Sequence, residues 1–557
     1  MQHVNSTKNT NTLNPKTMTM LLFVAFNISL SLFLIGTYSK TAVVVNYTDF
    51  LGLLPYLSAY YWIGLFILIC KLITIYFYDV CHAKLLSVCS VILLGIYLLS
   101  PTVFIQENGS FFVSYYPAGE IKSILQSHYL DVNREGQLIA YYSWPGMHFF
   151  SAINMLTLDV GLESLIKYIP MLWVIVFILL TYPLARKIGL DIRQWLLMAW
   201  LLITAQWVGQ YYYSAQALAI IIYLIILTFI LDINVSKFNS VILILAICTL
   251  VITHSLTPFA VFIGTCIMSI NKVPTRYLAI LYSVLFLAFY MYLSHNVFVY
   301  GVHEFIGKII NMENNEFWKS SEFRSEITSL SRKICHYAKG FFALSFGVFL
   351  IAALWALIKN RQTWPSEKRK IFFDALLFLT GIGMLLLFRY GTEMQYRVYL
   401  YSSVIIAGLF ILSYPRSKLI VIFTVMLTIV HFPAHYGTYS YEQTLNTELA
   451  GAKFIAHQVR PTVSYSYRFY PYVRFFDPNN LLVRCITFAP QYERSNPISL
   501  ELMSTAYISD SLQSHNYMVY AFEHDPIRNW IEENNGRIKM IYDNGSFWTY
   551  MNGLVGK

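Results

Sequence analysis

Long runs of apolar residues recur along most of the chain and are separated by short polar segments. A helix needs about 20 apolar residues to cross about 30 Å of hydrocarbon, and about 13 runs approach or exceed that length. The runs are 18–37, 56–78, 85–104, 168–185, 194–210, 215–232, 239–254, 256–271, 277–295, 340–358, 371–388, 398–413 and 418–434. This pattern predicts an all-α polytopic membrane protein with about 13 transmembrane helices.

Two of these runs, 239–254 and 256–271, are short and meet at a polar cluster. The alternative is one continuous helix over 239–271. Pro258 and the polar residues of Thr253–Pro258 favour a turn, because proline and clustered polar residues interrupt helices. The choice matters, since it sets the side of the membrane on which every later loop lies.

Lysine and arginine residues predict the orientation of the chain. With the N-terminus in the cytoplasm, the inner loops hold about 16 basic residues in about 60. The outer loops, without the C-terminal segment 435–557, hold about 12 in about 140. Cytoplasmic loops carry the excess of Lys and Arg, so the pattern predicts an N-in/C-out topology. The basic loop 359–370 falls inside only if 239–271 forms two spans.

The same pattern divides the chain into three parts. Residues 1–17 are polar and are predicted to form a cytoplasmic N-terminal tail. The transmembrane domain is predicted over 18–434, with large outer loops at 105–167 and 296–339. Residues 435–557 follow the last run.

This last segment, 435–557, is more highly charged than the rest, and its apolar runs are shorter. A helix is predicted near 441–459. The alternating residues 538–542 and 546–550 flank Asp543-Asn544-Gly545, which predicts a β-hairpin. We therefore expect a small extracytoplasmic α/β domain here.

Composition narrows the class of protein. Of the 557 residues, 57% are hydrophobic and only 12% charged, and the mean hydropathy is +0.53. A soluble domain carries roughly 25% charged residues, so a soluble multidomain enzyme and a disordered chain are both excluded. The net charge of +10 fits basic cytoplasmic loops, and no basic and aromatic surface indicates nucleic-acid binding. The seven Cys show no ligand spacing for zinc.

Polar residues that could take part in binding or catalysis gather on the predicted outer face. They are Glu120, His148, His254, Glu304, Arg389, Glu393 and Arg397. Such a set on an otherwise apolar scaffold indicates a site for a lipid-carried or extracellular substrate.

Glu120 belongs to a predicted interfacial helix over 117–130, with Ile121, Ile124 and Leu125 on one face. At the N-terminal end of that helix, its carboxylate could accept a proton from an incoming hydroxyl or amine, which makes it the candidate catalytic base. The alternative is that Glu120 only stabilises the helix N-terminus.

Arg389, Glu393 and Arg397 lie between two predicted spans at the outer edge of the bilayer. Arginine can hold a phosphate with two parallel hydrogen bonds, which suits a prenyl-phosphate donor. The alternative is an interfacial Arg–Glu pair that reaches out to water. Two arginines on the outer face run against the positive-inside bias.

His254 precedes the turn at Pro258, and His148 follows Trp144-Pro145-Gly146. Both are candidates for contacting a phosphate or an acceptor in a common cavity. The alternative for each is a hydrogen-bonded structural histidine.

Taken together, these features resemble the GT-C superfamily of integral-membrane glycosyltransferases. That group includes protein O-mannosyltransferases, aminoarabinose transferases and oligosaccharyltransferase catalytic subunits, and the likeness is greatest to its uncharacterised archaeal members. The resemblance covers predicted spans 1 to 12 and rests on Pro55–Gly64, Gly119–Leu125, Trp144–Phe150, Thr253–Pro258 and Arg389–Leu400.

The resemblance implies a sugar donor attached to a polyprenyl phosphate. An acidic residue of the first outer loop acts in such enzymes as base or positions a metal, a role that passes to Glu120. An arginine holds the donor phosphate, a role that passes to Arg389 or Arg397. The family often has an Asp/Glu pair in that loop, and here the second carboxylate would come from Asp131 or Glu135. This departure leaves open whether a divalent metal takes part and whether the chain is catalytic.

The predicted function is therefore transfer of a sugar from a polyprenyl-phosphate donor to an extracytoplasmic lipid, glycan or protein acceptor, at the cell membrane. One alternative is an O-antigen-type polymerase or ligase, whose site would lie in the loop 296–339 around Arg324 and Arg332. A non-catalytic transporter or flippase is another. The last is an assembly protein that docks through its C-terminal segment.

Overall fold

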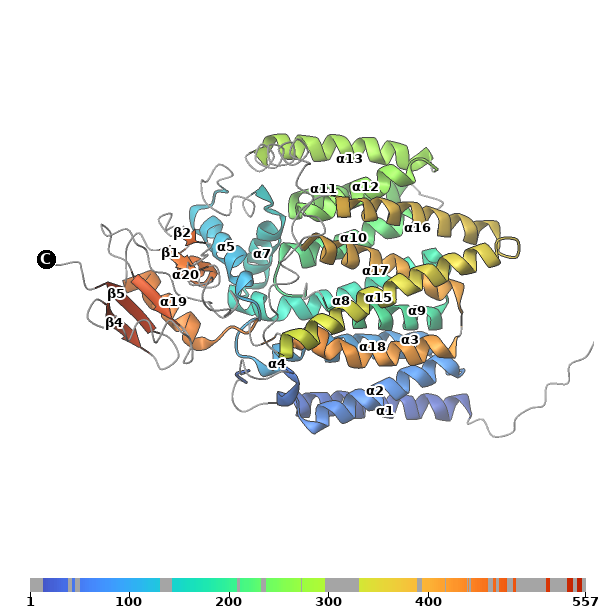
Figure 1. Ribbon diagram of the computed structural model, residues 1–557, viewed down its shortest axis with the longest axis horizontal. Helices are drawn as coiled ribbons and strands as arrows, with labels where there is room; N and C mark the ends of the chain where they lie inside the picture. Colours follow the sequence, from blue (N-terminus) through green and yellow to red (C-terminus); the bar gives the residue numbers. More distant parts are fainter. Residues whose placement is uncertain are drawn as a thin grey trace, which may run out of the picture.

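A computed structural model gives the arrangement of the helices (Figure 1). It describes residues 14–38, 43–45, 51–130, 143–207, 211–231, 237–271, 273–295, 330–387, 393–415, 417–437, 439, 442–458, 464–466, 470–477, 484–486, 517–520, 538–543 and 548–552. Long helices run side by side in a bundle, and shorter helices and strands lie at one end of it.

Each of the 13 predicted apolar runs contains a helix. These are α1 (Pro15–Thr37), α2 (Ala59–Phe77), α3 (Ala83–Leu99), α8 (Leu162–Ile188), α9 (Ile192–Thr204), α10 (Ala215–Ile230), α11 (Lys237–Thr253), α12 (Leu256–Met268), α13 (Val273–Tyr292), α15 (Leu330–Lys359), α16 (Ser366–Met384), α17 (Glu393–Ser413) and α18 (Lys418–Tyr436).

Seven helices of the described chain are long and apolar enough to cross a membrane, namely α1, α2, α8, α13, α15, α17 and α18. The coarse prediction of a helical protein with several membrane-spanning segments is confirmed. Five further apolar helices, including α9 and α12, are shorter. The count of 13 spans and the N-in orientation remain predictions.

The turn predicted between 239–254 and 256–271 is present, because α11 ends at Thr253 and α12 begins at Leu256. The run 85–104 was expected to be continuous, which is wrong. Helix α3 ends at Leu99, and Pro101 opens the short helix α4 (Pro101–Ile105). Proline fits the first position of a helix, where an N–H group would have no intrahelical partner.

Helix α9 is a short apolar helix enclosed by other helices. Every residue from Trp195 to Thr204 is buried, so the helix is apolar on all sides because protein surrounds it. It packs against α3, α8, α17 and α18. The indole N–H of Trp200 donates to Thr428 Oγ1 at 2.9 Å, which satisfies a polar group within the core.

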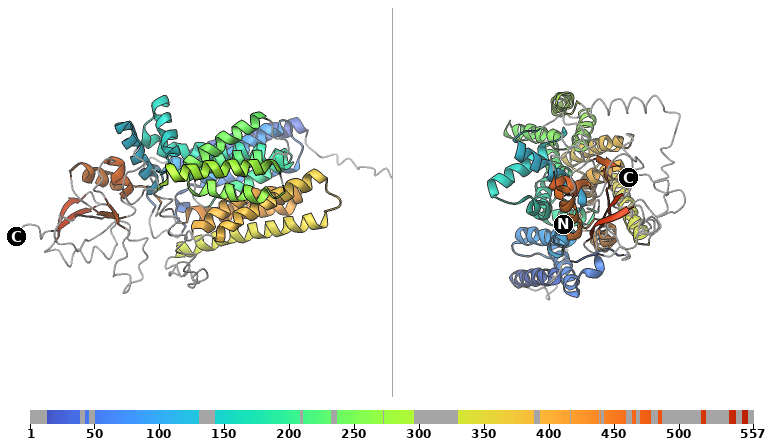
Figure 2. Two further views of the ribbon diagram at one scale, coloured as in Figure 1. Left: turned by 90° about the horizontal axis from the view of Figure 1, so that it is seen from above. Right: turned by 90° about the vertical axis from the view of Figure 1, so that its left-hand side faces the viewer.

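Two helices of the first predicted outer loop lie at one end of the bundle. They are α5 (Tyr115–Ser127) and α7 (Gly146–Leu158), and Figure 2 shows the C-terminal elements beyond the same end. Three short 3₁₀ turns are also present in the described chain. The turn η1 (Leu54–Tyr56) precedes α2, η2 (Phe112–Ser114) precedes α5, and η4 (Leu385–Leu387) follows α16.

The C-terminal segment contributes α19 (Asn446–Gln458) and α20 (Tyr470–Phe476), and α20 packs on α5. The ring of Tyr115 meets Tyr472 and Phe475 edge-on at centroid distances of 5.1 and 5.3 Å. Lys122 Nζ lies 3.4 Å from the ring centroid of Phe475, a cation–π contact. The predicted interfacial helix is thus covered by protein on this side.

Short strands complete the segment. Strands β1 (Ser464–Ser466) and β2 (Arg484–Ile486) pair in parallel, and β3 (Tyr517–Tyr520), β5 (Trp548–Asn552) and β4 (Ile538–Asp543) form an antiparallel sheet in that order. The predicted hairpin is present as the β4–β5 pair. That the whole segment forms a separate extracytoplasmic α/β domain remains a prediction.

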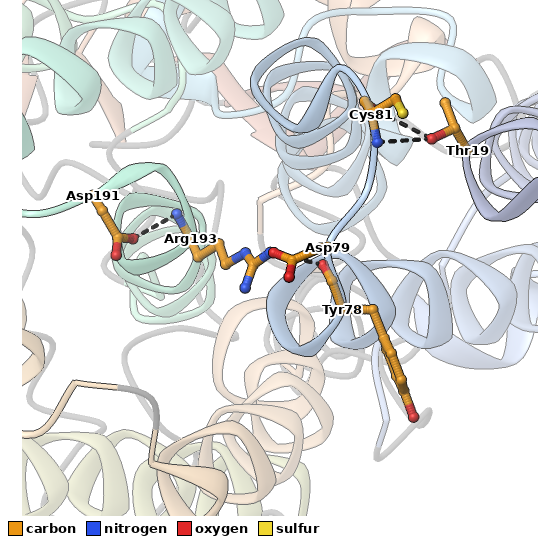
Figure 3. A network of polar contacts seen from close by, with 6 residues as sticks. All are labelled: Thr19, Tyr78, Asp79, Cys81, Asp191 and Arg193. Atoms are coloured by element: carbon orange, nitrogen blue, oxygen red, sulfur yellow. Dashed lines mark hydrogen bonds and ion pairs between the residues drawn. The ribbon is translucent and has the colours of Figure 1, made fainter. Parts of the chain in front are cut away.

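At the other end of the bundle, polar residues tie three helices together (Figure 3). The carboxylate of Asp191 accepts the backbone N–H of Arg193 at 2.9 Å and caps α9. The Arg193 guanidinium pairs with Asp79 at the end of α2. The hydroxyl of Thr19 in α1 accepts the N–H of Cys81 at 3.0 Å. We call this group the Asp191 corner.

Candidate functional site

A cavity of about 260 Å³ lies at the bundle end that carries α5 and α7. It is lined by Val113, Pro117, Trp144, Met147, His148, Tyr212, Ser214, Ala215, Gln216, Thr253, His254, Ser255, Leu256 and Arg397. The structure thus brings together three of the predicted site residues, His148, His254 and Arg397, from three separate parts of the chain. Their roles remain predictions.

Three helices begin at this cavity. Helix α7 begins at Gly146, α10 at Ala215 and α12 at Leu256, and residues at each of these beginnings line the wall. A helix N-terminus has free N–H groups and a partial positive charge equivalent to about half a unit. In α12 and α10 some of these N–H groups already donate to His254 and Ser214, so what these ends contribute is mainly their partial positive charge. Together with the guanidinium of Arg397, that charge makes the cavity favourable for an anion.

His254 is held by the start of α12. Its Nδ1 accepts the backbone N–H groups of Leu256 and Thr257, each at 3.2 Å. Because Nδ1 is an acceptor, a neutral His254 carries its proton on Nε2 and presents an N–H donor. The hydroxyl of Thr257 lies 2.8 Å from the Tyr401 hydroxyl, which ties this corner to α17. The histidine therefore serves the local structure and lines the cavity as well.

Arg397 is half-buried near the start of α17. Glu393 is the first residue of that helix. Arg389 and Glu304 lie outside the described residues, as does Arg324 of the alternative polymerase site, and Arg332 stands near the start of α15. Among the described residues, Arg397 represents the predicted phosphate-binding arginines, and it lines the cavity.

Glu120 lies in the second turn of α5, because that helix begins at Tyr115. The alternative that Glu120 stabilises the helix N-terminus is therefore wrong. The first turn of α5 contains no acidic residue. Glu120 is fully buried and does not line the cavity among the described residues, whereas His148 does.

His148 and Glu120 interact electrostatically in this buried place. Burial lowers the pKa of His148 from 6.5 to about 4, and the nearby charge of Glu120 acts in the opposite direction. The imidazole is 2% exposed and is neutral at pH 7, so it can accept a proton. Of the two, the histidine is the one that meets the cavity.

Gly146 lets the start of α7 approach the end of α11 closely. A Cβ atom at this position would lie 2.5 Å from Thr253 Oγ1 and 2.9 Å from Thr253 Cα. No side chain fits there without displacing backbone, so the glycine fixes where α7 and His148 stand relative to His254.

The described residues do not fit a metal site at Glu120. Within this part of the chain, no group of three or more His, Cys, Asp or Glu side chains could hold an ion. Asp131 and Glu135, the predicted second carboxylates, lie outside the described residues.

Sequence reasoning did not select Gln216 as a site residue. It is the second residue of α10 and lines the cavity with 3% exposure. The sequence signal for Gln216 is a polar amide at the second position of the apolar run 215–232, two residues after the helix-capping Ser214. Trp144 belongs to the segment Trp144–Phe150, on which the resemblance rests, and it too lines the cavity.

Comparison with known proteins yields no match, either to a protein-family model or to a curated protein.

Proposed function

We propose that the protein is a membrane-embedded transferase that moves a sugar from a polyprenyl-phosphate donor to an extracytoplasmic acceptor. One observation carries the proposal: an anion-favouring cavity and a buried proton acceptor share one wall at the end of an apolar bundle. The cavity supplies Arg397 and three helix N-termini, and His148 supplies the proton acceptor.

The positively charged side of the cavity would hold the phosphate of the donor. Arg397 can bind two phosphate oxygens at once, and the N–H of His254 can donate to a third. As the bond between the sugar carbon and the phosphate oxygen breaks, the electron pair moves to that oxygen. The fixed positive groups stabilise the developing charge without reorganising.

The transfer also requires that the acceptor hydroxyl lose its proton. His148 would take the proton of an acceptor hydroxyl as its oxygen bonds to the sugar carbon. The carboxylate of Glu120 would stabilise the imidazolium that forms, as an acidic partner does behind a catalytic histidine. In this proposal, Glu120 positions His148 and stabilises its charge. The role of proton acceptor, predicted for Glu120 from the sequence, belongs to His148.

The place of the cavity suits a lipid-carried donor. Helices able to cross a membrane run from this end of the molecule, so a prenyl chain could remain in lipid while its phosphate enters the cavity. In the proposed N-in topology this end is extracytoplasmic.

The orientation has its own test. Single cysteines at the exposed positions Ser127 in α5 and Arg361 after α15, in a protein otherwise free of cysteine, should label from opposite sides of a sealed vesicle. Labelling of both from the same side would overturn the proposed topology.

The activity is tested with purified protein in lipid vesicles, supplied with polyprenyl-phosphate sugars and scored for sugar transfer. Removing a general base typically costs 10²–10⁴-fold in rate, so His148→Asn should fall in about that range and Glu120→Gln should also lose activity. Thermal unfolding of each variant controls for folding. Turnover unchanged in both variants would remove the proposed proton acceptor and its partner.

A further inference from the structure

Two buried polar side chains of the cavity wall have polar atoms without a hydrogen-bond partner among the described residues. Neither Oε1 nor Nε2 of Gln216 has a hydrogen-bond partner among the residues that the structure describes. The same holds for Nε1 of Trp144. Both side chains are buried, at 3% and 6% exposure, and both line the cavity.

Such groups are unusual in a folded protein. The large majority of buried side-chain polar atoms have a hydrogen-bond partner, and leaving one unpaired is unfavourable. The three atoms have almost no accessible surface of their own, so a ligand in the cavity reaches them when the two side chains turn toward it, and it then supplies the missing partners. These three atoms therefore describe the ligand that completes them.

The chemistry of the three atoms favours a neutral ligand rich in hydroxyl groups. The Gln216 amide offers one acceptor and two donors, and the Trp144 indole offers one more donor. A phosphate only accepts hydrogen bonds and would leave Oε1 of Gln216 unpaired. A hydroxyl both donates and accepts, so neighbouring hydroxyls of a sugar ring would satisfy the amide at both ends.

Both side chains stand on well-fixed backbone. Gln216 lies in the first turn of α10, where Ser214 Oγ accepts the N–H of Ala217 at 3.2 Å. The carbonyl of Ser143, next to Trp144, accepts the Ser294 hydroxyl at 3.1 Å. The Trp144 ring meets Tyr290 edge-on at 5.8 Å. With the backbone fixed in this way, only the two side chains have to turn for a ligand to bind, which limits the entropy that binding costs.

We infer that Gln216 and Trp144 form a sugar-reading subsite, distinct from the phosphate-binding groups Arg397 and His254. This inference rests on the proposed function, and it adds that Gln216 determines which sugar is accepted. The amide would pair with hydroxyls of the transferred ring, and the indole N–H would donate to another oxygen of that ring.

The test is equilibrium binding to the purified full chain in lipid nanodiscs. The probes are farnesyl phosphate and farnesyl phosphate carrying mannose, glucose or arabinose. The wild type should bind at least one glycosylated probe more tightly than the bare phosphate. Gln216→Met, which keeps length and apolar volume, should reduce that preference about tenfold and leave the affinity for farnesyl phosphate unchanged. Trp144→Phe should reduce it about threefold.

Gln206→Met is the matched control. Gln206 is also buried, at 2% exposure, and its Nε2 is also without a partner in the described chain, but it does not line the cavity. This variant should leave the preference unchanged. Gln216→Asn, which keeps the amide and shortens the side chain, replaces Gln216→Met if the latter unfolds, with the same expected loss of preference.

The outcomes separate the two proposals. If farnesyl phosphate and every glycosylated probe fail to bind, the proposed function itself fails. If all probes bind but Gln216→Met and Gln216→Asn keep the wild-type preference, the phosphate site stands and the sugar-reading subsite is overturned.

Discussion

The two ends of the helical bundle use their polar groups in different ways. At the Asp191 corner, Arg193 pairs with Asp79 (Figure 3). Asp191 and Gln194 also cap α9 reciprocally. At the cavity end, three helix N-termini face one space, and the amide of Gln216 has no partner among the described residues. Helix α8 separates the two ends, and its 27 residues span about 40 Å.

The comparison teaches how to recognise a functional end in a protein made mostly of apolar helices. Polar groups that satisfy one another fix the geometry and are complete without a ligand. Buried polar atoms beside a cavity that no described residue satisfies, such as those of Gln216, are complete only when something binds. Changes at the cavity end should therefore affect function first, and changes at the Asp191 corner should affect stability alone.

Among the changes that test the contrast between the two ends, the largest expected effect is on turnover. Arg397→Gln should lower kcat/KM for a polyprenyl-phosphate sugar by about 10²–10³-fold, because one fixed positive group at the leaving phosphate is lost. Arg361→Gln is the control, since Arg361 is exposed between α15 and α16. Its activity should match that of the wild type. Equal losses in the two variants would mean that Arg397 has no special place.

Acid should destabilise the protein through His148. The folded pKa of about 4 lies below the usual 6.5, so folding stability is complete above pH 6.5 and is lost as the pH falls toward 4. The loss from this group is on the order of 3 kcal/mol, at 1.36 kcal/mol for each pKa unit. Thermal unfolding of wild type and His148→Gln at pH 7 and pH 4.5 measures it. An equal fall in Tm in both proteins would exclude His148 as the cause.

Gly146 should be intolerant of a side chain. The Cβ of Gly146→Ala would collide with Thr253, so the variant should lose about 1–3 kcal/mol of unfolding free energy and should transfer sugar more slowly. Gly340→Ala in α15 is the matched control, because no atom lies within 4 Å of its added Cβ. The control should be stabilised by about 0.5–1 kcal/mol. Chemical denaturation compares the two, and an unaffected Gly146→Ala would contradict the close approach.

The smallest effect is expected at the Asp191 corner. Asp191→Ala removes the cap of α9 and should cost about 1 kcal/mol of unfolding free energy. Turnover per folded molecule should stay at the wild-type value. A loss of turnover without a loss of stability would break the contrast between the two ends.

The sequence predicts the helices well and their surroundings poorly. Each of the 13 apolar runs contains a helix, and Pro258 with its polar neighbours predicts the break before α12. The same runs cannot distinguish lipid from protein as the apolar surroundings. The run 194–210 therefore gave no sign that α9 is enclosed by other helices.

The site was partly predictable for a similar reason. Residue type and predicted sidedness select His148, His254 and Arg397, which the structure brings to one cavity. The relation between Glu120 and His148 depends on how α5 packs against α7, and no local pattern encodes that contact. Gln216 was missed because an uncharged amide at the edge of an apolar run carries little weight until its lack of partners is seen.

The cover that α20 places over α5 has a consequence for biosynthesis. The rings of Tyr115 and Tyr472, which meet edge-on, belong to segments that leave the ribosome far apart in time. The spanning helices are inserted while α5 is still bare, and its buried face gains this cover only near the end of translation. A chain that stops before position 470 therefore keeps its hydrophobic body but leaves Tyr115 and Lys122 open to water, so late truncations should produce inserted protein that cannot work.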